Sequence, residues 1–165
     1  MAGPTRIIGL GNPLWTDEGV GYHVLEALRQ VELPPDVELV DGGTGGLNLL
    51  VPMTGAARII FVDAVRSGHP PGTLFRLPES ALAGSPVQVK LSHAMGLDEV
   101  IRIYREVEGG TAEILIYCVE AADVSTFGME LTPAVRAAVP SVVRHILADL
   151  SKAPGTWGSD CPAMT

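Results

Sequence analysis

The stretch that decides the fold is Arg6-Ile-Ile-Gly-Leu-Gly-Asn-Pro-Leu-Trp-Thr-Asp-Glu-Gly-Val-Gly21. It starts as a short apolar strand and passes through a turn containing glycine and proline. It then becomes helical, with Thr16 as the expected N-cap and Asp17 and Glu18 facing the positive end of the helix dipole. We expect this helix to run to about Gln30. A strand that turns directly into a helix is the opening unit of an α/β fold.

Outward from this stretch, β-branched runs alternate with segments of helical period. We expect strands at Arg6–Leu10, Val37–Val40, Arg58–Val62, Thr73–Leu77 and Glu113–Val119, and further helices over Leu47–Met53, after Ser92, and from Thr132-Pro133 to Leu150. The last strand is apolar on both faces, as a central strand should be, and the short fourth strand is expected at an edge. The pattern predicts an α/β protein: a single three-layer domain over residues 1–152, with a mostly parallel twisted sheet of about five strands and helices on both faces. Residues 153–165, rich in turn formers, are predicted to be a flexible C-terminal tail.

Composition limits the partners and the compartment. The chain has 165 residues, with 11 Lys and Arg against 19 Asp and Glu, so its formal charge is -8. No large cationic surface exists to neutralise a phosphate backbone, and nucleic acid is not an expected partner. No apolar run approaches the length of a membrane span, and no signal peptide opens the sequence. Cys118 and Cys161 form no disulfide framework, so we expect a cytoplasmic protein without a membrane span.

Three possible metal ligands follow the expected strands. In an open parallel sheet, ligands bind outside the carboxyl ends of the strands. The first strand leads to Asp17 and Glu18, the third is expected to end on Asp63, and His93 lies at the start of a later helix. Two carboxylates and one imidazole make a three-ligand site with open positions, which is typical of a catalytic or substrate-sensing metal.

Each of these residues also has a purely structural interpretation. The helix dipole alone explains Asp17, and Glu18 is open between the two interpretations. An acid at the end of a buried strand, such as Asp63, often caps the next loop, and a single histidine at a helix start, such as His93, is often structural. His69 is a substitute ligand or a solvated loop residue. Only the joint placement of these side chains favours a site.

The glycine-rich turn does not match a dinucleotide-binding fingerprint. Gly9 and Gly11 follow a strand, but the third glycine of a dinucleotide fingerprint would fall on Leu14, so the fingerprint fails. The second strand leads into Asp41-Gly-Gly-Thr-Gly-Gly46 at the same expected edge. These glycines allow a tight turn or the close approach of another chain's backbone.

Several segments together closely resemble the nickel-iron hydrogenase maturation endopeptidases. They are Gly9–Gly21, Asp41-Gly-Gly-Thr44, Val62-Asp-Ala64, Ser92-His93 and Leu131-Thr-Pro133, and the similarity covers about Arg6 to Leu150. The resemblance implies a hydrolase that removes a short C-terminal peptide from the hydrogenase large-subunit precursor once nickel is installed.

The resemblance also implies roles for individual residues. The family's metal ligands fall on Glu18, Asp63 and His93, which would be both catalytic and nickel-binding, with the nickel supplied by the precursor. Other divalent metals can occupy such a site in vitro. We further expect Asp41, Gly42, Gly43 and Thr44 to hold the substrate tail, and Asp17 to lie behind the ligands at most.

The sequence departs from the family's pattern in one segment and is open to three alternative interpretations. Many family members carry Gly-x-Gln-Pro after the last strand, whereas this chain has Cys118-Val-Glu-Ala121, which leaves the role of Glu120 open. A non-catalytic chaperone or binder that senses the metal in a hydrogenase large subunit would show the same sequence features. Gly9–Pro13 also resembles the opening of peptidyl-tRNA hydrolases, but that family's downstream histidine motif is missing and the charge is wrong for tRNA. A nucleotide-binding domain is disfavoured by the failed glycine pattern.

Overall fold

A computed structural model describes residues 3–82 and 96–158, and its centre is a five-stranded sheet in the order β2-β1-β3-β5-β4. The strands are β1 (Thr5–Gly9), β2 (Val37–Asp41), β3 (Arg58–Val65), β4 (Leu74–Pro78) and β5 (Glu113–Glu120). β2, β1, β3 and β5 are parallel, and β4 runs antiparallel to β5 at the edge. The predicted strands and the edge position of the fourth are confirmed.

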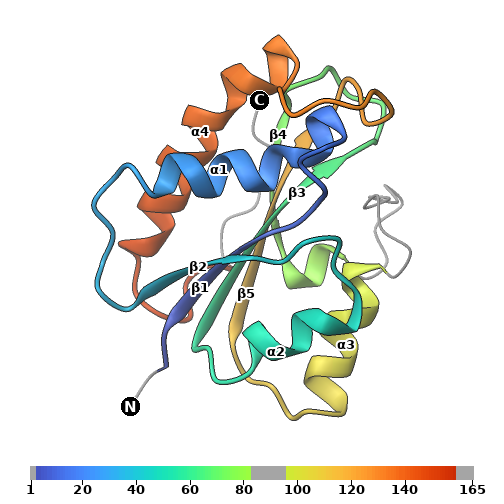
Figure 1. The fold of residues 1–165 in the computed structure, drawn as a ribbon. Helices are drawn as coiled ribbons and strands as arrows, with labels where there is room; N and C mark the ends of the chain where they lie inside the picture. Colours follow the sequence, from blue (N-terminus) through green and yellow to red (C-terminus); the bar gives the residue numbers. More distant parts are fainter. Residues whose placement is uncertain (1–2, 83–95, 159–165) are drawn as a thin grey trace.

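Helices cover both faces of the sheet (Figure 1). The helical elements are η1 (Thr16–Gly19), α1 (Val20–Leu28), η2 (Gly46–Leu49), α2 (Leu50–Met53), η3 (Glu79–Ala81), α3 (Leu97–Glu106) and α4 (Pro133–Leu150). α1 and α4 lie on one face, and α2 and α3 lie on the other, each over its own apolar core. The predicted three-layer α/β architecture is confirmed. Across the described ranges, no helix has both the length and the apolar character needed to cross a bilayer.

Two predicted boundaries were wrong near the carboxyl edge. Thr16 is not the N-cap of α1: its φ is 55°, it lies in η1, and its hydroxyl donates to the Thr126 carbonyl at 2.5 Å. β3 does not end on Asp63, because Asp63 pairs with Cys118 and the ladder continues for two more residues. β5 runs alongside β3 long enough to keep these residues in the sheet.

Glycines bring α1 against the sheet. A Cβ placed on Gly9 would lie 2.8 Å from the Gly21 carbonyl oxygen, and a Cβ on Gly21 would lie 2.8 Å from the Val62 carbonyl oxygen. Because these neighbours are backbone atoms, a side chain at either position would push the helix away. The close approach sets the start of α1 across the ends of β1 and β3, where the candidate site lies.

The residues after α4 do not form a flexible tail up to the last described position. Trp157 is 1% exposed, and its Nε1 donates to the Asp149 carbonyl at 3.0 Å. The Arg58 guanidinium lies 3.7 Å from the centroid of the Trp157 ring and donates to the carbonyls of Asp149 and Lys152, at 3.2 Å each. The predicted start of the tail at residue 153 is therefore too early, because the Trp157 side chain packs in the core.

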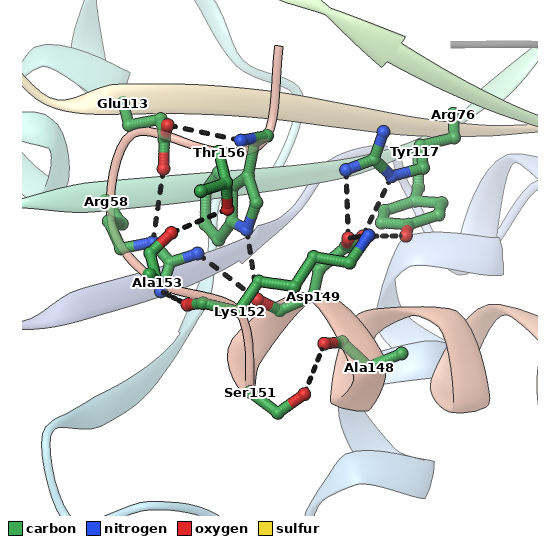
Figure 2. Close-up of polar contacts among 11 residues, drawn as sticks. Arg58, Arg76, Glu113, Tyr117, Ala148, Asp149, Ser151, Lys152, Ala153 and Thr156 are labelled. Atoms are coloured by element: carbon green, nitrogen blue, oxygen red, sulfur yellow. Dashed lines mark hydrogen bonds and ion pairs between the residues drawn. The ribbon is translucent and has the colours of Figure 1, made fainter. Parts of the chain in front are cut away.

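A buried ionic cluster supports this anchor (Figure 2). The Asp149 carboxylate accepts two hydrogen bonds from Arg76, at 3.0 and 2.9 Å, one from the Tyr117 hydroxyl, and an ion pair from Lys152 at 3.1 Å. Burial alone would raise the pKa of Asp149, but these donors hold it below its ordinary value. Arg58, beside this cluster, is the first residue of β3. The cluster therefore has a structural role and lies away from the carboxyl edge of the sheet.

Candidate active site

The segments that follow β1, β2 and β3 meet at the carboxyl edge of the sheet. The Leu10 amide donates to the Val62 carbonyl at 2.8 Å, and the Gly11 amide donates to the Gly43 carbonyl at 2.7 Å. The chain leaving β1 is thus bonded on one side to β3 and on the other to the loop after β2. This is the edge where the sequence predicted ligands.

Glu18 is held at this edge by a close turn. Gly11 has φ 106°, and a Cβ there would lie 2.0 Å from the Glu18 carbonyl oxygen, so only glycine fits. The Glu18 Oε1 accepts a hydrogen bond from the Asn12 amide at 3.3 Å, and the residue is half-buried. The glycine-containing turn therefore positions the Glu18 side chain and is not a nucleotide-binding loop.

Asp63 lies on the neighbouring strand β3, against which η1 packs. Its side chain is fully buried, and its Oδ1 accepts a hydrogen bond from the Ala64 amide at 2.8 Å. The structure thus brings together the turn that carries Glu18 and the strand that carries Asp63. The third predicted ligand, His93, and its neighbour Ser92 lie outside the described residues. In the two ranges that are described, no three or more histidine, cysteine or acidic side chains are grouped to hold a metal ion.

Asp17 is a buried clamp rather than a helix-dipole residue. Its carboxylate accepts hydrogen bonds from the backbone amides of Ala122, Asp123 and Thr132, at 2.9, 3.0 and 2.8 Å. The Thr132 hydroxyl adds a further bond at 2.8 Å. Asp17 therefore ties the turn of Glu18 to the loop after β5 and to the start of α4. Sequence reasoning missed this role because its partners are more than one hundred residues away.

Glu120, whose role the sequence left open, anchors the loop after β3. It is 2% exposed, and its carboxylate accepts hydrogen bonds from the Ser67 amide at 2.9 Å and the His69 amide at 2.8 Å. The Ser67 hydroxyl lies 3.0 Å from Glu120 and 2.9 Å from Nδ1 of His69. His69 is thus held at the carboxyl edge by the loop itself, and its imidazole contacts the Phe75 ring edge-on.

Cys118 is not suited to act as a nucleophile. Its side chain is fully buried, and burial followed by the carboxylates of Asp63 and Glu120 raises the pKa of its thiol. Because the thiolate is the reactive form, this cysteine stays inert at neutral pH. The prediction of a small buried hydrophobic residue is confirmed.

The loop after β2 presents backbone to the same edge. The Gly42 amide donates to the Gly9 carbonyl at 2.7 Å, and Asp41 Oδ1 accepts from the Gly43 amide at 2.9 Å. A Cβ on Gly42 would meet the side chains of Ile8 and Leu10 at 2.7 and 2.8 Å. Asp41 and Thr44 are exposed. The geometry fits a loop that another chain can approach, and its substrate role stays a prediction.

These features define a class of protein: a three-layer α/β domain with a glutamate-bearing glycine turn beside a buried aspartate at the carboxyl edge. Comparison with known proteins identifies the family. Residues 22–149 match the family model described as hydrogenase maturation protease. The chain belongs to the hydrogenase maturation protease family.

Individual relatives agree along most of their length. The hydrogenase 2 maturation protease of Escherichia coli is 32% identical over 146 residues, which are 87% of this chain and 88% of that protein. The hydrogenase expression/formation protein HoxM of Cupriavidus necator is 33% identical over 138 residues, 82% of this chain and 68% of the relative. The solved structure of the hydrogenase maturating endopeptidase HybD from E. coli superposes with a TM-score of 0.74 at 31% identity, covering 89% of this chain and 91% of that one. The resemblance seen in the sequence motifs is confirmed.

Proposed function

We propose that this chain is an endopeptidase that removes the C-terminal extension of a nickel-iron hydrogenase large-subunit precursor after nickel insertion. The observation that carries the proposal is the family match over residues 22–149, together with relatives named as maturation proteases. It is supported by the carboxyl edge, where the Glu18 turn and the Asp63 strand are in contact. The reaction is hydrolysis of one peptide bond.

Glu18, Asp63 and His93 engage the nickel that the precursor already carries. Two carboxylate oxygens and an imidazole nitrogen are ligands that nickel accepts, and three protein ligands leave positions for the precursor's own groups. Recognition then depends on the metal, so a precursor without nickel is not held. The nickel, as part of the substrate, can polarise the scissile carbonyl or activate a bound water.

The loop from Asp41 to Thr44 holds the substrate tail in this proposal. Gly43 has φ 57°, a conformation that lets the backbone turn sharply and expose its polar groups. An extended peptide lying against this loop would pass beside the turn of Glu18, because Gly11 and Gly43 are hydrogen-bonded. The substrate tail and the metal would thus bind at the same edge of the sheet.

The test is the intact mass of a nickel-loaded large-subunit precursor before and after incubation with the protein. We expect loss of a C-terminal peptide with the wild-type chain and no loss with Glu18→Gln, Asp63→Asn or His93→Ala. Glu32→Gln, an exposed acid far from the edge, is the control and should cut normally. Circular dichroism and urea unfolding must show that each variant is folded.

Two results would contradict the proposal. Wild-type turnover by folded His93→Ala would remove that residue from the site. A precursor that binds but keeps its full mass with the wild-type chain would favour the chaperone alternative instead.

A further inference from the structure

Two segments far apart in the sequence lie side by side, joined by a β-bridge between Trp15 and Gly128, and each carries exposed apolar side chains. Leu14 is 40% exposed and Trp15 is 39% exposed, while Phe127 and Met129 are 71% and 52% exposed. We call these four residues the apolar patch. Single exposed apolar residues are ordinary, but a group that includes two aromatic rings marks an interaction site.

Hydrogen bonds and a ring contact hold the two segments of the apolar patch together. The Gly128 amide donates to the Leu14 carbonyl at 2.7 Å, and the Thr16 amide donates to the Gly128 carbonyl at 2.8 Å. The rings of Trp15 and Phe127 meet edge-on, with centroids 5.8 Å apart. The buried Asp17 carboxylate also joins the same two segments, because it accepts a hydrogen bond from the Asp123 amide at 3.0 Å. A surface ordered before it binds loses little conformational entropy on binding, which favours a docking role.

The apolar patch is continuous with the candidate active site. The Glu18 amide donates to the Trp15 carbonyl at 3.2 Å, so the patch and the predicted nickel ligand share one turn. Asp123 and Glu130 flank Phe127 and Met129 in the sequence, and we call these two acids the acidic rim of the patch; Glu130 also lies 3.8 Å from Arg136. A partner that reaches Glu18 therefore passes over apolar side chains bordered by negative charge.

We propose that the apolar patch docks the hydrogenase precursor through an apolar segment flanked by positive charge, next to the bond that is cut. This inference rests on the proposed function and adds a recognition surface separate from the Asp41–Thr44 loop. The charge of -8 on each chain and the acidic rim disfavour a second copy of this protein as the occupant. The proximity of the patch to Glu18 favours the substrate.

The two tryptophans of the chain give a direct test. Trp15 lies in the apolar patch, whereas Trp157 is 1% exposed and serves as the internal control. The full-length protein would be labelled with 5-fluorotryptophan and titrated with unlabelled nickel-loaded precursor, followed by fluorine NMR. We expect the Trp15 resonance to shift saturably and the Trp157 resonance to stay unchanged. An unmoved Trp15 resonance at saturation, with binding established by gel filtration, overturns the proposal, and so does a Trp15 shift that depends only on the protein's own concentration.

Kinetics separate this inference from the proposed function. In the Trp15→Ser, Phe127→Ser double variant we expect KM for the precursor to rise by about tenfold or more, with kcat changed by less than about twofold. Val107→Ser, which removes a side chain 73% exposed at the end of α3, is the matched control and should leave both constants unchanged. If the wild-type chain does not cut, the proposed function fails, while the NMR titration still reports docking. If the wild-type chain cuts and the double variant keeps its KM, only the docking proposal fails.

Discussion

At the position of Asp17, one carboxylate accepts hydrogen bonds from the backbone amides of two segments, the loop after β5 and the start of α4. The side chain is fully buried, and the amides of Ala122, Asp123 and Thr132 all point at it. Since bonds to a charged acceptor are stronger than neutral ones, the clamp both stabilises the fold and fixes the turn that carries Glu18.

Asp17→Asn should lower the free energy of unfolding by about 2 kcal/mol. The side-chain NH2 group that replaces one carboxylate oxygen is a hydrogen-bond donor, and it would face backbone N–H groups that are also donors. Urea denaturation at neutral pH measures the change. Glu32→Gln, an exposed acid, is the control and should be neutral within about 0.5 kcal/mol. Equal stability of Asp17→Asn and the wild-type chain would show that the clamp is dispensable.

The thiol of Cys118 offers a second prediction at this scale. Burial and the carboxylates of Asp63 and Glu120 raise its pKa, so thiolate is scarce and reagents have no access. In a Cys161→Ser background, which leaves one cysteine, we expect no reaction with a disulfide reagent in the native protein and one equivalent after denaturation. Rapid labelling of the native protein would place Cys118 at the surface.

The residues of the candidate site divide into those that sequence could find and those it could not. The sequence singles out Glu18 and Asp63 because ligands bind outside the carboxyl ends of parallel strands, and their role as metal ligands stays a prediction. The clamp of Asp17 and the anchoring role of Glu120 depend on partners 105 and 53 residues away. No local pattern records such contacts.

At the scale of elements, the end of α4 is fixed by the segment that follows it. Trp157 fills a place in the core over α4 and β3 and is stacked by Arg58. Replacing Trp157 with Ala should lower the free energy of unfolding by about 3–5 kcal/mol, because a large buried ring leaves a cavity. Trp15→Ala, at the exposed ring, is the control, and thermal or urea unfolding compares them. A small and equal effect of both changes would mean that the segment is not anchored.

The Asp149 cluster should appear in the pH dependence of stability. Its donors hold the folded pKa of Asp149 below its ordinary value, so this group contributes fully above about pH 4 and less as pH falls through the folded pKa. Asp149→Asn should cost about 3 kcal/mol at pH 7, and its deficit relative to the wild-type chain should shrink below about pH 4. Urea unfolding at several pH values measures both, with Asp36→Asn, an exposed acid, as control. A deficit that does not vary with pH would contradict the charged role.

The types of the elements were predictable because strands and helices have distinct apolar periods. The register of β3 beside β5 was not predictable, because it depends on pairing between distant segments. The segment from Ala153 to Trp157 was misjudged for a related reason. Its turn-forming residues describe the backbone correctly, but only the tertiary structure supplies a slot for the Trp157 ring.

At the scale of the whole molecule, the buried Asp149 cluster lies away from the edge where the candidate active site lies. The ionic cluster of Arg76, Tyr117 and Asp149 lies between the sheet and the end of α4, whereas Glu18, Asp63 and the apolar patch lie at the carboxyl edge. Asp149→Asn should therefore change unfolding without changing which precursor is recognised, and the patch variant should do the reverse. In the proposed function, this division leaves the carboxyl edge to bind the precursor.

The most direct measurement is the intact mass of one hydrogenase large-subunit precursor in two forms, nickel-loaded and nickel-free, each incubated with the wild-type protein under identical conditions. We expect the loaded form alone to lose a C-terminal peptide, because in the proposed function Glu18, Asp63 and His93 bind the metal of the precursor. Equal cleavage of both forms would contradict nickel recognition, and unchanged mass in both, despite binding, would contradict the endopeptidase itself.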